Sequence, residues 1–163
     1  MIRLIDPKLE AWSLDTNRKP LIVRGARQIG KSWSITKFGQ RFKGGVHTIN
    51  LEQRPDWHSV FDLNLDAKRI LSEFEILLNR RIIPGEDLLF LDEIQACPKA
   101  IMALRYFHEQ MPGLHVIIRT VAFDLVHPVG RVFPRVFAQI ILYFIDYGFI
   151  EIKSSLVCPV LVD

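Results

Sequence analysis

The hydrophobic residues of this chain form patterns that are typical of buried strands. Two short runs are continuously apolar, as in strands covered on both faces of a sheet. A third run is apolar except at His115, and a fourth alternates apolar with polar residues. The four predicted strands span residues 21–23, 46–51, 88–91 and 114–118. Each is short and is followed by turn-forming or polar residues, which favours separate strands of one sheet.

Between these strands, apolar residues recur at helical spacing. One stripe precedes the first strand as a short helix or arm, and the others follow the first three strands. The stripes consist of Leu4, Ile5, Leu9, Trp12 and Leu14; Trp33, Ile35, Phe38 and Phe42; Ala67, Ile70, Leu71, Phe74, Leu77 and Leu78; and Ile101, Leu104, Phe107 and Met111. We expect Gly44-Gly45 to stop the second helix and Pro98 to lie in the first turn of the last one. Strands that alternate with helices predict an α/β fold, with a parallel sheet and helices on both faces.

Composition narrows the class of protein. A length of 163 residues suggests one domain, and 49% hydrophobic with 24% charged residues describes a globular chain. A net charge of +3 permits contact with nucleic acid, although no dense basic run argues for it. Cys97 and Cys158 form no metal-ligand pattern, and no secretory leader or membrane span is evident. We therefore expect a cytoplasmic protein with reduced thiols.

The strongest motif comes directly after the first predicted strand. It fits the pattern G-x-x-x-x-G-K-[ST], which cradles nucleotide phosphates where it joins a strand to a helix. Its residues are Gly25, Ala26, Arg27, Gln28, Ile29, Gly30, Lys31 and Ser32. The two glycines permit the tight turn, and the backbone N–H groups and the start of the helix attract an anion. Lys31 is expected to reach the β- and γ-phosphates and Ser32 to ligate Mg²⁺, so the motif predicts binding of ATP with Mg²⁺.

Two carboxylates, Asp92 and Glu93, come directly after the predicted strand at residues 88–91. A strand that emerges beside the phosphate loop would place Asp92 near the metal, which it would hold through the water shell. Glu93 would orient the attacking water or accept its proton. This second acid favours hydrolysis of the β–γ phosphoanhydride of ATP over phosphorylation of a small molecule, with Glu93 and Lys31 as the catalytic residues.

Residues 18–32 and 88–98 together resemble a family of prokaryotic AAA-type P-loop ATPases, whose members carry a second, C-terminal domain of unknown function. Residues 104–109 and 114–117 extend this resemblance, which covers roughly residues 1–118. It implies an AAA-type ATP-binding core, ATP hydrolysis and a tendency to form homo-oligomers. It does not identify a client protein or a pathway.

The chain departs from that family beyond residue 119. The family usually has small residues and serine after the fourth strand, at the sensor position. Here Thr120 is either a sensor for the γ-phosphate or an ordinary strand-end threonine, and Arg131 is either an arginine finger or a surface arginine. We expect an ATP-binding core at residues 1–119 and a divergent apolar tail at residues 120–163. We hypothesise that the tail arises from a truncation or a frameshift.

Three functions remain open from the sequence. The chain is an ATP-hydrolysing AAA-type module, a nucleotide-binding remnant that does not hydrolyse ATP, or a nucleic-acid-associated binding protein. Measuring ATP affinity beside phosphate release separates the first two. Salt-dependent affinity for DNA or RNA would identify the third.

Overall fold

Within residues 5–25, 30–121 and 150–152, which the computed structural model describes, five strands form one sheet. All of the strand pairs are parallel, and the strand order is β2-β3-β4-β1-β5. The strands are β1 (Leu21–Gly25), β2 (Gly45–Asn50), β3 (Asp87–Asp92), β4 (His115–Val121) and β5 (Ile150–Ile152). The four strands and the α/β class predicted from the hydrophobic pattern are confirmed.

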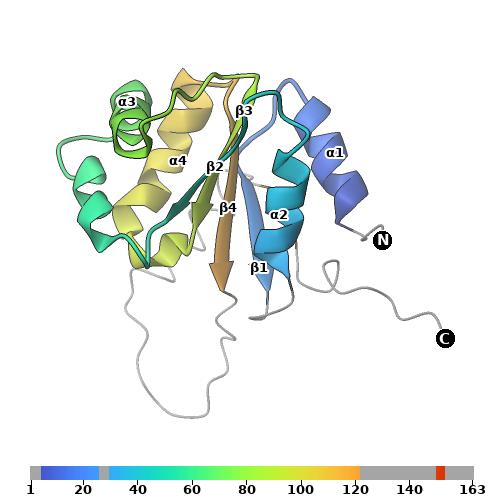
Figure 1. Cartoon of the computed structure of the whole chain (residues 1–163), viewed down its shortest axis with the longest axis horizontal. Helices are drawn as coiled ribbons and strands as arrows, with labels where there is room; N and C mark the ends of the chain where they lie inside the picture. The colour runs from blue at the N-terminus through green and yellow to red at the C-terminus, as the bar shows by residue number, and fades with distance from the viewer. Residues whose placement is uncertain (1–4, 26–29, 122–149, 153–163) are drawn as a thin grey trace, which may run out of the picture.

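Helices cover both faces of the sheet, as predicted (Figure 1). On one face lie α1 (Asp6–Leu14) and α2 (Lys31–Gly39). On the other lie α3 (Ala67–Leu78), α4 (Pro98–Gln110) and the two short 3₁₀ helices η1 (Pro55–Phe61) and η2 (Ile94–Ala96). Side chains of β3 alternate between these layers, because successive residues of a strand point to opposite faces. Leu88 and Phe90 pack toward α1 and α2, whereas Leu89 and Leu91 pack toward α3 and α4.

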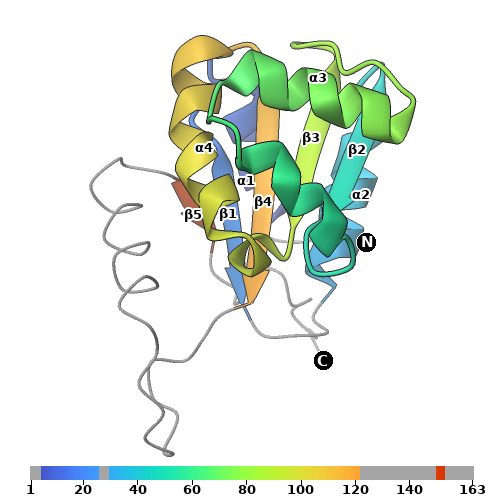
Figure 2. The ribbon, with the colours of Figure 1, turned by 90° about the vertical axis from the view of Figure 1, so that its left-hand side faces the viewer.

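Strand β5 was not predicted from the sequence. It pairs with β1 and lies at the edge of the sheet (Figure 2). The expected boundary between residues 119 and 120 falls inside β4, which continues to Val121. Within the described residues, no helix has the length and apolar character needed to cross a membrane.

Three predicted apolar stripes include side chains that the structure exposes. Leu14 of α1 is 81% exposed, Trp33 of α2 is 53% exposed, and Leu77 of α3 is 42% exposed. The buried side of α2 carries the predicted Ile35 and Phe38, together with Ser34, which was not predicted. The prediction failed at Trp33 because helical spacing was assigned from apolar character alone, and a small serine fills the buried position.

Helix α2 also ends earlier than predicted. The helix stops at Gly39, and a turn carries the chain through Gly44 to β2. The Gly44 N–H donates to the Glu86 carbonyl, and a Cβ at Gly44 would overlap the Asp87 carboxylate. The turn therefore packs directly against the start of β3, and only glycine fits there.

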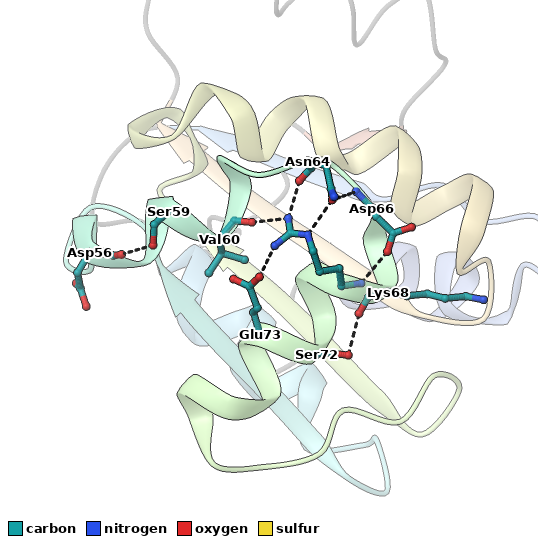
Figure 3. Close-up of polar contacts among 9 residues, drawn as sticks. Asp56, Ser59, Val60, Asn64, Asp66, Lys68, Ser72 and Glu73 are labelled. Carbon is teal, nitrogen blue, oxygen red and sulfur yellow. Dashed lines mark hydrogen bonds and ion pairs between the residues drawn. The ribbon is translucent and has the colours of Figure 1, made fainter.

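The loop before α3 is fixed by a single arginine. Asp66 caps α3 by accepting a hydrogen bond from the backbone N–H of Arg69 (2.8 Å). The Arg69 guanidinium donates to the carbonyls of Val60 (2.7 Å) and Asn64 (2.6 Å), and pairs with Glu73. Figure 3 shows these partners gathered between η1 and α3. Arg69 thus has a structural role far in the chain from the phosphate loop.

Two buried histidines have pKa values that the fold shifts. Burial lowers the pKa of His47, although the nearby Asp87 carboxylate acts in the opposite direction. Burial also lowers the pKa of His115, and the charge of Arg18 lowers it further. Both histidines are therefore held neutral by the folded chain.

Acidification is expected to destabilise the chain through these two groups. The unfolded chain, with histidine pKa values of about 6.5, binds protons more readily than the folded chain. The contribution of the two histidines to the free energy of unfolding is thus constant well above about pH 6.5, and the free energy of unfolding falls as the pH drops below that value. Urea unfolding at a series of pH values measures the slope of the free energy of unfolding against pH. The double variant His47→Gln/His115→Gln should have a shallower slope, and an unchanged slope would assign the acid sensitivity to other groups.

Candidate functional site

The carboxyl ends of β1, β3 and β4 meet at one edge of the sheet. Gly25 ends β1 and Asp92 ends β3, with β4 between these two strands. The register pairs Leu91 with Ile118, so Asp92 falls beside Arg119, the next residue of β4. Ligands of open parallel α/β sheets bind at this edge.

The two ends of the predicted phosphate loop lie at this edge as expected. Gly25 closes β1, and Gly30 precedes α2, which begins at Lys31. Gly30 has a φ of +78°, a conformation that glycine adopts without strain. The predicted loop residues Ala26, Arg27, Gln28 and Ile29 lie outside the described residues. The strand-to-helix setting that the motif requires is therefore present.

Lys31 is buried within a group of charged side chains, and it is only 2% exposed. Burial lowers the pKa of its ammonium group, and the positive charge of Arg119 lowers it further. The carboxylates of Glu93 and Asp92 act in the opposite direction. The ammonium group of Lys31 thus interacts electrostatically with both predicted acids and with one cation that was not predicted from the sequence. Ser32, the other predicted ligand on α2, is half-buried.

Asp92 and Glu93 are both buried, at 6% and 7% exposure. Glu93 has a left-handed backbone (φ +51°, ψ +46°), which is uncommon for a residue with a side chain. This turn lets the Glu93 N–H donate to Asp92 Oδ1 at 3.0 Å. Such backbone strain gathers at functional sites, where it fixes the direction of a side chain.

Arg119 binds both carboxylates. Its Nε donates to Asp92 Oδ1, and its Nη2 donates to Glu93 Oε1 at 2.5 Å. Gln95 Nε2 donates to the other oxygen of Glu93, Oε2, at 2.5 Å. Burial alone would lower the pKa of Arg119, but its hydrogen bonds and the charges of the two acids raise it. Each oxygen of Glu93 therefore already accepts one strong hydrogen bond.

The donor set suits a magnesium ion that arrives with a nucleotide. Asp92 and Ser32 offer carboxylate and hydroxyl oxygens, the ligands that Mg²⁺ prefers, while the ion keeps several waters. Throughout the described part of the chain, no three His, Cys, Asp or Glu residues cluster to hold a metal by themselves. Water would have to complete the coordination, together with phosphate oxygens when a nucleotide is bound.

Arg119 is a site residue that was not predicted from the sequence. Residues beyond the fourth strand were interpreted as a departure from the expected pattern, yet the register places Arg119 next to Asp92. Its position one residue after the predicted strand was the available signal. The sensor candidate Thr120 comes next on β4 and is half-buried, whereas Arg131 lies outside the described residues.

Comparisons with known proteins agree with this fold. Residues 17–147 match the family described as AAA domain. Among solved structures, "Structure of Drosophila ORC bound to AT-rich DNA and Cdc6" is similar at 14% identity with a TM-score of 0.50. The match covers 96% of this chain and 56% of that chain, so this chain spans little more than half of its length. "Crystal structure of the DnaC helicase loader" matches at 13% identity and a TM-score of 0.47, over 90% of this chain and 86% of that chain. The comparison with curated proteins gives no match.

Proposed function

This chain belongs to the AAA domain family, and from that premise we propose that it binds ATP with Mg²⁺ at the carboxyl edge of its sheet. The observation that carries the proposal is that Lys31, at the start of α2, lies close enough to Asp92 and Glu93 for their charges to interact. Lys31 places a buried ammonium group at the start of α2, directly after Gly30. A positive charge at a helix N-terminus is suited to binding the negatively charged triphosphate of ATP. All of these groups lie within residues 1–119, which we propose as the nucleotide-binding core.

We further propose that the bound ATP is hydrolysed. Lys31 would hold the β- and γ-phosphates, and Asp92 and Ser32 would hold Mg²⁺, which supplies charge stabilisation at the phosphates when it is bound. Glu93 would orient the attacking water and accept its proton. Its buried side chain and constrained backbone support this role, because a general base must be held in a defined direction.

A non-hydrolysing ATP-binding domain is the second candidate. The specific observation in its favour is that both oxygens of Glu93 are already engaged, by Arg119 and by Gln95. One lone pair of each Glu93 oxygen is thus occupied, which leaves fewer directions from which a water could approach the carboxylate. The two candidates share the binding site and differ only in whether the bound ATP is cleaved.

Phosphate release at saturating ATP and Mg²⁺ is the experiment that separates them. For the hydrolysing module, we expect steady release of phosphate that stops when EDTA removes the metal. Binding of ATP without any release above that of Lys31→Ala would support the non-hydrolysing domain. Absence of ATP binding by the folded chain would refute both.

A further inference from the structure

Among the described side chains, two positive and two negative charges lie close together at the carboxyl ends of β3 and β4 and the start of α2. Lys31 and Arg119 are positive, whereas Asp92 and Glu93 are negative. Two carboxylates buried side by side repel each other and need positive charge close by. Arg119 supplies that charge through direct hydrogen bonds to both acids.

The contact with Asp92 engages the carboxylate that the proposed site would offer to a metal. The Asp92 side chain accepts hydrogen bonds on Oδ1 from Arg119 and from the Glu93 N–H. A guanidinium and a divalent cation both bind carboxylate oxygens and repel each other at short distance. If both were held by Asp92, their mutual repulsion would weaken the binding of each.

We propose that Arg119 is the resident counter-ion of the acidic pair and competes with Mg²⁺ for Asp92. The inference rests on the proposed function for the identity of the metal. It makes Arg119 a positioning residue, because it acts through Asp92 and Glu93. When the metal binds, the guanidinium must leave Asp92, and this also breaks the arrangement that holds Glu93 Oε1.

The position of Arg119 suits such an exchange. It lies close to the carboxyl end of β4, and its side chain is 15% exposed, so part of the side chain is already in contact with solvent. Its long side chain can move while the strand stays in place. A guanidinium is also weakly hydrated compared with an ammonium, which favours its pairing with carboxylates in a buried site. A divalent cation carries twice the charge and can compete for the same carboxylate.

Metal rescue of stability tests the proposal without any nucleotide. Arg119→Ala should lower the melting temperature, because it leaves the acidic pair short of positive charge. Added MgCl₂ should then raise the melting temperature of Arg119→Ala more than that of the wild-type chain. At a free Mg²⁺ concentration about ten times its Kd, the folded-to-unfolded ratio should rise about tenfold.

Two controls separate a counter-ion from a purely structural arginine. Arg69→Ala removes another arginine with several hydrogen bonds, one of them to a carboxylate, outside this site. It should also be destabilised, yet Mg²⁺ should not restore it. In the Arg119→Ala background, Asp92→Asn should abolish the rescue, because it removes the metal ligand.

The outcomes decide the proposal independently of ATP binding. A larger Mg²⁺ effect on Arg119→Ala, lost in the double variant, supports it even if no variant binds ATP. An equal Mg²⁺ effect on Arg119→Ala, Arg69→Ala and the wild-type chain overturns it. Should Arg119→Ala fail to fold, Arg119→Gln takes its place, with the same comparison of Mg²⁺ effects.

Discussion

Glu93→Gln is expected to bind ATP about as tightly as the wild-type chain and to lose about 10²- to 10⁴-fold in turnover, the usual contribution of a general base. Glutamine has nearly the same shape as glutamate but does not accept a proton at neutral pH. The side chain is buried and fixed by a left-handed backbone, so a substituted amide should occupy the same place.

Steady-state phosphate release and equilibrium ATP binding should be measured together on Glu93→Gln. Glu52→Gln is the matched control, because it makes the same chemical change on an exposed residue after β2. It should hydrolyse ATP at the wild-type rate. Wild-type turnover by Glu93→Gln would show that Glu93 is not the base.

Lys31→Ala is expected to weaken ATP binding by roughly 10- to 100-fold. A hydrogen bond to a charged group is worth about 1.5–3 kcal/mol, and each 1.4 kcal/mol changes affinity about tenfold. The ammonium is buried at the start of α2, so water cannot easily replace it. Loss of this group also leaves Arg119 to balance the charges of Asp92 and Glu93.

Calorimetric titration with ATP in the presence of Mg²⁺ measures this effect. Lys37→Ala is the control, since Lys37 is exposed on the same helix and its loss removes an equal charge. The affinity of this variant for ATP should match that of the wild-type chain. Equal weakening by both variants would mean that overall charge, rather than the buried position, determines binding.

Much of the fold could be predicted because hydrophobic periodicity reports burial directly. The apolar run at residues 88–91 lies within β3, whose residues are all buried, and Leu88 and Phe90 face a different layer from Leu89 and Leu91. The same information is weaker for a helix that is partly exposed, and it misplaced Trp33. Periodicity also carried no signal for β5, which has only three residues.

The sequence predicted three residues of the candidate site and did not predict the contact that Arg119 makes with two of them. Local motifs identified Lys31, Asp92 and Glu93, because phosphate binding and metal binding require those residue types at fixed spacing. Arg119 belongs to no such motif. Its role depends on the register between β3 and β4, a long-range relation that the sequence of either strand does not contain.

Direct titration of the folded wild-type chain with ATP and Mg²⁺ tests the central claim most simply. We expect saturable binding of one ATP per chain, weakened by Lys31→Ala and unaffected by Lys37→Ala. No saturable binding by a chain that circular dichroism shows to be folded would contradict the claim.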